Sequence, residues 1–128
     1  MEKIKVLLVE DEPTLAMIIK DTLDGNEFDI TLAANGEEGL SRYAEINPDI
    51  IVADIMMPKM SGIEMCRKIK SNFETSHIPV ILLTAQTAEE YTMQGLKMGA
   101  DDYVTKPFNV KHLFMRCNNL VNSRKLLQ

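Results

Sequence analysis

Five short apolar runs alternate with segments of helical periodicity along this chain, and this alternation limits the possible folds more than any other feature. The runs are residues 6–9, 30–33, 50–53, 80–83 and 103–104. Most are apolar and β-branched at consecutive positions, as expected of strands that are buried on both faces. Short buried strands that alternate with helices build a parallel sheet. The pattern therefore predicts an α/β fold, a doubly wound sheet of five parallel strands with helices on both faces.

The segments between the strands carry apolar residues at helical spacing. Pro13 suits the first turn of a helix, and Asn35 with Glu38, like Thr87 with Glu90, has the spacing of a helix cap and its reciprocal partner. The second helix is expected at about 36–44 and another at about 87–98. The predicted apolar stripes are Leu15, Ile18, Ile19, Thr22 and Leu23; Ile63, Cys66, Ile69 and Phe73; and Val110, Leu113, Phe114, Cys117, Leu120 and Val121.

Length and charge exclude several classes of protein. The 128 residues, 45% of them hydrophobic, predict one domain spanning 1–128. A net charge of -5 argues against direct binding to nucleic acid. No run approaches the roughly 20 apolar residues that cross a bilayer, so a cytoplasmic location without membrane binding is expected. Cys66 and Cys117 lie in apolar stripes, which predicts buried free thiols rather than metal ligands or redox centres.

Polar residues follow four of the five predicted strands. The first strand is followed by residues 10–12, all acidic, the third by Asp54, the fourth by Thr84 and the fifth by Lys106. In open parallel sheets the ligand site lies beyond the carboxyl ends of the strands. Carboxylates, a hydroxyl and an ammonium group are therefore expected to converge there.

Crowded carboxylates repel one another unless a cation neutralises them. Magnesium suits such a site because it prefers oxygen ligands and works beside phosphate oxygens. Phosphoryl transfer to a carboxylate needs an in-line nucleophile and donors to the equatorial oxygens. Asp54, a metal ion, Thr84 and Lys106 could together meet these needs.

Four motifs, in this order and spacing, resemble those of response-regulator receiver domains of two-component signalling. They are VEDE at 9–12, DIMMPKMSG at 54–62, LTA at 83–85 and GADDYVTKPF at 99–108. The resemblance covers essentially the whole chain and implies a flavodoxin-like strand order, 2-1-3-4-5. It also implies a signalling switch that catalyses only its own phosphorylation and dephosphorylation.

The resemblance implies that a sensor histidine kinase phosphorylates Asp54. Glu10, Asp11 and Asp54 would bind Mg²⁺ or Mn²⁺ through carboxylate oxygens, and Met56 through its backbone carbonyl. Many relatives have Asp at the position of Glu10, so its contact with the ion can run through water. Thr84 and Lys106 would contact the phosphoryl group.

The resemblance also implies how the signal leaves the site. Thr84 would move towards the phosphoryl group and Tyr103 would swing inward behind it, while the bond before Pro107 is expected to be cis. The implied switch face comprises 87–98, Tyr103 and 110–121, and would bind a partner or form a homodimer. Met56 and Gln86 would tune hydrolysis. An attached DNA-binding or kinase output domain could lie outside this chain.

Three alternatives stay open at this stage. Phosphohydrolases of the haloacid dehalogenase type also use an aspartate nucleophile, but they need a second aspartate two positions later, where this chain has Met56. Flavodoxin-like cofactor proteins bind phosphate after the first strand, where acidic residues 10–12 would repel it. A degenerate receiver would act by protein contact without phosphorylation.

Overall fold

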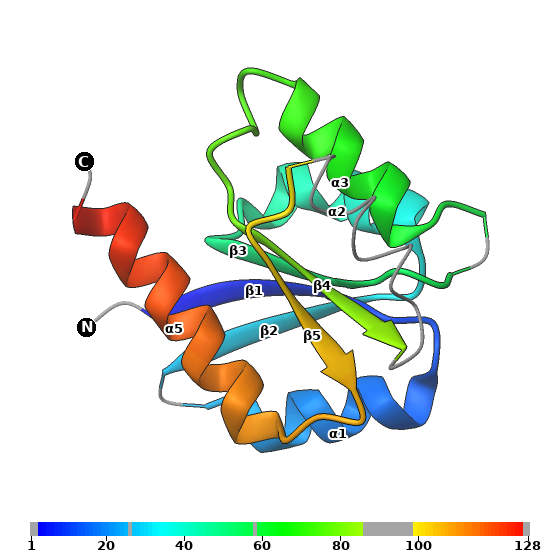
Figure 1. The fold of residues 1–128 in the computed structure, drawn as a ribbon, viewed down its shortest axis with the longest axis vertical. Coiled ribbons are helices and arrows are strands. Elements are labelled where there is room, and N and C mark those ends of the chain that lie inside the picture. The colour runs from blue at the N-terminus through cyan, green and yellow to red at the C-terminus, as the bar shows by residue number, and fades with distance from the viewer. Residues whose placement is uncertain (1–2, 26, 58, 86–98, 127–128) are drawn as a thin grey trace.

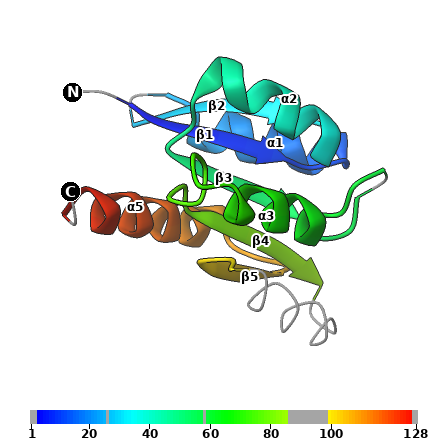
Figure 2. The same ribbon diagram turned by 90° about the horizontal axis from the view of Figure 1, so that it is seen from above.

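A single parallel sheet organises the computed structural model, which describes residues 3–25, 27–57, 59–85 and 99–126. Its strands are β1 (Ile4–Val9), β2 (Phe28–Ala33), β3 (Ile50–Asp54), β4 (Val80–Ala85) and β5 (Asp102–Lys106). All pairings are parallel, in the order β2-β1-β3-β4-β5 that Figure 2 shows. The predicted fold class and strand order are confirmed.

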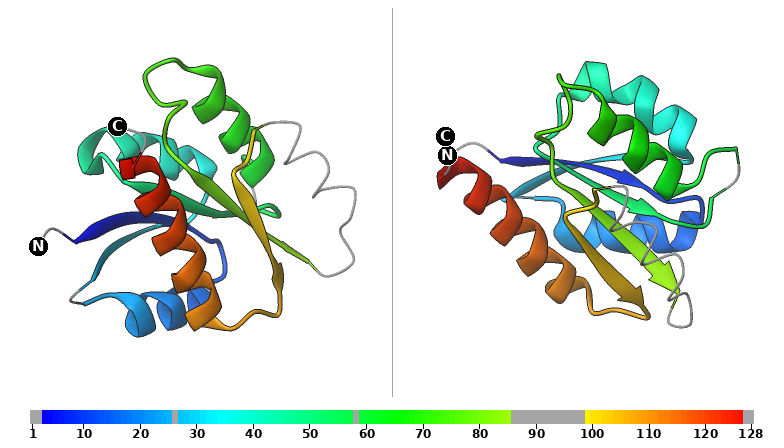
Figure 3. Two further views of the ribbon diagram at one scale, coloured as in Figure 1. Left: turned by 60° about the vertical axis from the view of Figure 1, so that its left-hand side comes forward. Right: turned by 45° about the horizontal axis from the view of Figure 1, so that its top comes forward.

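Two layers of helices cover the sheet. The described helices are α1 (Pro13–Leu23), α2 (Gly36–Ile46), α3 (Gly62–Ser71) and α5 (Val110–Leu126). Helices α1 and α5 lie against one face and α2 and α3 against the other (Figure 1). The strand arrowheads point away from the side where β1 begins and α5 ends (Figure 3). Among the helices of the described residues, none is long and apolar enough to cross a membrane.

Alternate residues of the central strands form two separate cores. Val6 and Leu8 pack under α1 and α5, whereas Leu7 and Val9 pack under α2 and α3. Every residue of β3 is buried. Each fully buried aliphatic side chain contributes roughly 1.5–3 kcal/mol. The consecutive apolar positions in the sequence follow from this burial on both faces.

Four details of the sequence prediction are wrong. Ile18 is exposed, although it was placed in the apolar stripe of α1, because that helix turns Ala16 and Ile19 towards the sheet. Thr22, in the same predicted stripe, is also exposed. Phe73 is 94% exposed because α3 ends two residues earlier, so helical periodicity no longer applies there. The strands also extend beyond the predicted runs, most at β5, where charged ends flank the apolar centre.

The predicted cap of α2 is present. The amide of Glu38 donates to Oδ1 of Asn35 at 3.0 Å, and the Glu38 carboxylate accepts from the amide of Ala34 at 3.1 Å. These bonds satisfy amides that a helix start otherwise leaves unpaired. They hold the turn between β2 and α2 in a defined conformation. The second predicted pair, Thr87 with Glu90, lies outside the described residues.

Candidate metal centre

Three carboxylates meet at the carboxyl edge of the sheet. Glu10 follows β1 and Asp54 ends β3, and these strands are neighbours, with Val9 paired to Ala53. One ligand oxygen from each of Glu10, Asp11 and Asp54 lies within 4.8 Å of the others. Glu10 is 3% exposed and Asp54 is 6% exposed, whereas Asp11 is open to solvent. The convergence predicted from the strand ends is therefore present.

An ammonium group completes this cluster. Lys106, the last residue of β5, donates from Nζ to Oδ2 of Asp54 at 2.8 Å and to Oε1 of Glu10 at 3.1 Å. Burial alone would lower the pKa of Lys106, but the hydrogen bonds and charges of the two carboxylates outweigh it and raise that pKa. Lys106 therefore stays charged and offsets part of the negative charge.

One ammonium group does not neutralise the site. Burial raises the pKa of Glu10 to about 7, and its hydrogen bond with Asp54 and the charge of that neighbour add to the effect. A carboxyl group with so high a pKa indicates an excess of negative charge in a partly desolvated place. The candidate metal ligands are carboxylate oxygens of Glu10, Asp11 and Asp54, close enough together to share one ion. Such ligands fit a hard divalent cation.

Backbone contacts set the orientation of the central carboxylate. Oδ1 of Asp54 accepts from the amide of Met56 at 3.2 Å, and the amide of Gly62 donates to the carbonyl of Ile55 at 3.0 Å. A Cβ atom on Gly62 would lie 2.3 Å from the Asp54 carbonyl oxygen, so only glycine fits there. The hydrogen bond between Gly62 and Ile55 thus closes a loop beside the carboxylate, of which residues 55–57 and 59–61 are described.

The other predicted site residues occupy the same edge or the neighbouring strand. Thr84 is buried near the end of β4, one position beyond Leu83, which pairs with Asp54. Met56 has a side chain 58% exposed, and the ligand role of its carbonyl stays a prediction. Tyr103 is 37% exposed on β5. The bond between Lys106 and Pro107 is cis, as predicted. Gln86 and the 87–98 part of the switch face lie outside the described residues.

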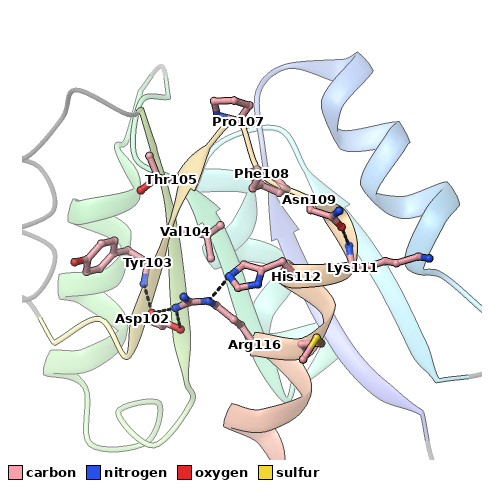
Figure 4. A pocket seen from close by; sticks show the side chains of 11 residues that line it. Asp102, Tyr103, Val104, Thr105, Pro107, Phe108, Asn109, Lys111, His112 and Arg116 are labelled. Atoms are coloured by element: carbon pink, nitrogen blue, oxygen red, sulfur yellow. Dashed lines mark hydrogen bonds and ion pairs between the residues drawn. The ribbon is translucent and has the colours of Figure 1, made fainter.

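A second feature, which the sequence patterns did not predict, lies between β5 and α5. Figure 4 shows a pocket there, about 800 Å³ in volume, with Arg116 between Asp102 and His112. Arg116 binds both oxygens of the Asp102 carboxylate at 2.7 Å and donates from Nε to Nε2 of His112 at 3.0 Å. His112 and Arg116 are four residues apart on α5, but only the packing of α5 beside β5 brings Asp102 to Arg116, so no sequence spacing marks that ion pair.

The sheet order and the acidic edge define a doubly wound α/β domain with a cluster of carboxylates, able to hold a metal ion, beyond its strands. The family model for the response regulator receiver domain matches residues 6–118, and the chain belongs to that family. It is therefore a receiver domain of the kind found in two-component response regulators.

Relatives and solved structures agree with this assignment. The chain is 42% identical to "Histidine kinase P4" of Formosa agariphila, over 99% of the chain and 9% of that protein. It is 37% identical to the phosphate regulon transcriptional regulatory protein PhoB of Rhizobium meliloti, over 94% of the chain and 53% of that protein. A response regulator receiver domain protein from Clostridium thermocellum has a TM-score of 0.89 at 33% identity, covering 98% of this chain and 99% of that one. The chain thus spans about half, or far less, of these curated relatives.

Proposed function

We propose that Asp54 accepts a phosphoryl group from a sensor histidine kinase in a magnesium-dependent reaction. The observation that supports this best is the joint contact of Lys106 with Asp54 and Glu10, at 2.8 and 3.1 Å. This arrangement surrounds one carboxylate with positive charge on one side and metal-binding oxygens on the other. Residues 1–128 form one receiver domain in this proposal.

Each residue of the cluster has a role in the transfer. Carboxylate oxygens of Glu10, Asp11 and Asp54 and the carbonyl of Met56 would hold Mg²⁺ or Mn²⁺. When bound, the ion supplies charge neutralisation for the equatorial phosphoryl oxygens. An oxygen of Asp54 attacks phosphorus in line, so that an O–P bond forms while the N–P bond of the kinase phosphohistidine breaks. Lys106 donates to the phosphoryl oxygens.

Thr84 also donates to those oxygens and connects the site to the surface. Phosphorylation adds close to two negative charges and three acceptor oxygens, which favour the conformer in which the hydroxyl of Thr84 points at them. Tyr103 then turns inward, and the switch face of 87–98, Tyr103 and 110–121 binds its partner or a second copy of the domain. Phosphorylation shifts the equilibrium between the two conformers only by the difference between its interaction free energies with them.

The chain acts as a cytoplasmic switch for an output module and not as an enzyme that turns over an external substrate. Several relatives are named as transcriptional regulators and one as a histidine kinase, which supports a DNA-binding or kinase output domain beyond this chain. The receiver itself would not contact nucleic acid or the membrane.

Treatment with acetyl phosphate and Mg²⁺, followed by intact-mass measurement, tests the proposal. The protein should gain about 80 Da, the mass of one phosphoryl group. Asp54→Asn should remove the gain, and Asp21→Asn, which changes an exposed carboxylate on α1, should keep it. No gain in the unaltered protein would indicate a degenerate receiver, and a gain retained in Asp54→Asn would move the acceptor elsewhere.

A further inference from the structure

The turn between β2 and α2 touches both loops that carry the acidic site. On one side, the carbonyl of Ala33 accepts a hydrogen bond of 3.0 Å from the amide of Glu10. On the other side, Gly36, the first residue of α2, lies against Met60 in the loop that follows Asp54. The turn therefore lies between Glu10 and the loop that follows Asp54.

The contact at Gly36 leaves no room for a side chain. An added Cβ atom would lie 2.9 Å from Cβ of Met60, 3.0 Å from its Cγ and 3.0 Å from its carbonyl oxygen. Cβ and the carbonyl oxygen move only with the backbone, so rotation of the Met60 side chain cannot relieve the clash. Any substituent at Gly36 must push the loop itself.

The end of this loop at Gly62 cannot move to accommodate such a displacement. Gly62 is held by its hydrogen bond to Ile55 and by its contact with the Asp54 carbonyl, where an added Cβ would lie 2.3 Å from the oxygen. Lys59 has a positive φ of 67°, a conformation that leaves little freedom to a residue with a side chain. A displacement at Met60 therefore passes towards Met56, whose amide donates to Oδ1 of Asp54.

We propose that Gly36 is a positioning residue for the metal and phosphoryl-acceptor site. Its missing side chain lets α2 pack closely against Met60, and this keeps the loop where the Met56 amide donates to Asp54. This inference rests on the proposed function, since it concerns the same site. Gly36 touches neither the ion nor the phosphoryl group and acts only through the loop.

Gly39 offers a matched control on the same helix. A Cβ atom there would lie 2.9 Å from Cε of Met65 and 3.0 Å from Cγ2 of Val9. These atoms belong to side chains in the core below α2, and none belongs to the 55–61 loop. Gly39→Ala therefore adds the same methyl group in a comparably tight place, but away from the loop that follows Asp54.

The test is calorimetric titration with Mg²⁺ alone, with a urea unfolding curve for each protein. Gly36→Ala should raise the dissociation constant for Mg²⁺ roughly tenfold, as loss of support for metal ligands commonly does, and should shift the backbone amide resonance of Met56. Gly39→Ala should change that constant less than about twofold, since its contacts are with core side chains that can shift and not with the backbone of the loop after Asp54. Equal effects of the two substitutions, or unchanged Mg²⁺ affinity in Gly36→Ala, would overturn the inference.

A double variant keeps the test decisive if Gly36→Ala does not fold. Met60→Gly removes the Cβ and Cγ atoms that the new methyl group would meet and leaves only the contact of 3.0 Å with the carbonyl oxygen. Gly36→Ala with Met60→Gly should therefore fold, and its Mg²⁺ affinity should differ from that of Met60→Gly alone by clearly less than the roughly tenfold change expected of Gly36→Ala. A double variant that is unfolded, or that still binds weakly, would overturn the inference. The proposed function fails separately, and only if the unaltered protein neither binds Mg²⁺ nor gains a phosphoryl group.

Discussion

The ammonium nitrogen of Lys106 lies 2.8 Å from a carboxylate oxygen of Asp54, although the two residues end strands that are separated by β4. The same nitrogen reaches Glu10 at 3.1 Å. One lysine thus joins the ends of β5, β3 and β1 at a single point. This contact offsets part of the negative charge of the two carboxylates.

Replacing Lys106 with alanine should destabilise the metal-free protein by about 1–3 kcal/mol, the usual worth of hydrogen bonds to charged groups. The loss leaves two crowded carboxylates without their ammonium partner. Mg²⁺ should recover part of this stability, because a cation replaces the missing charge. Urea unfolding with Mg²⁺ and with EDTA measures both effects.

Lys111→Ala, at an exposed position on α5, is the matched control and should change neither value appreciably. If Mg²⁺ stabilised Lys106→Ala no more than it stabilises the unaltered protein, the charge-balance explanation would be wrong.

The pH dependence of the unfolding free energy should reveal the raised pKa of Glu10. Its pKa is about 7 in the folded protein, against an ordinary value of 4.5. Between these values the folded state binds a proton that the unfolded state has released, so this contribution is present below pH 4.5 and is lost as pH rises through 7. In EDTA, Glu10→Gln should therefore gain stability relative to the unaltered protein as pH rises from 5 to 8.

Titrating groups that do not contact Glu10 are common to the two proteins, so the difference between their unfolding curves reports Glu10 together with its partners Asp54 and Lys106. Curves that ran parallel over the whole range would contradict the raised pKa.

A second partly buried lysine should affect the stability of the protein but not its affinity for Mg²⁺. Lys70, on α3, donates to the carboxylate of Asp101 and the carbonyl of Ile78, each at 2.7 Å. Asp101 in turn accepts from the amide of Val80 at the start of β4, on the edge of the sheet opposite Asp54. Lys70→Met should cost about 1–3 kcal/mol in unfolding free energy and leave Mg²⁺ affinity unchanged.

Lys68→Met provides the comparison, because Lys68 is an exposed lysine on the same helix. A loss of Mg²⁺ affinity in Lys70→Met would show that the two edges of the sheet are coupled, contrary to this expectation.

The two cysteines should be inert in the native protein. Burial raises the pKa of Cys66 to about 11 and that of Cys117 to about 12, so almost no thiolate forms at pH 8. A disulfide exchange reagent should label neither thiol without denaturant, and both in urea. Rapid native labelling of either one would mean that its side of the sheet opens readily.

The sequence predicted the features that depend on strand ends and on local periodicity. Glu10 and Asp54 could be assigned to one site because they directly follow buried runs, and parallel strands bring such positions to one edge. The Asn35 cap was visible because its partner lies only three residues away. Both signals are local, so they survive without knowledge of the packing.

Features that depend on packing between distant elements could not be predicted. The ion pair of Lys70 with Asp101 joins α3 to the segment before β5. The contact of Gly36 with Met60 forms only when α2 packs against the loop that follows Asp54. Phe73 was misplaced because periodicity does not mark where α3 ends. The two contacts are tertiary, so spacing along the chain does not predict them.

Borohydride trapping tests the central claim most directly. Acyl phosphates are reduced to the alcohol, so an Asp54 that carries a phosphoryl group becomes homoserine, which peptide mass mapping can locate. After incubation with acetyl phosphate, homoserine should appear at position 54 with Mg²⁺ and be absent with EDTA. Reduction at another carboxylate, or equal reduction at Asp54 without the metal, would contradict a cation-dependent acceptor at this site.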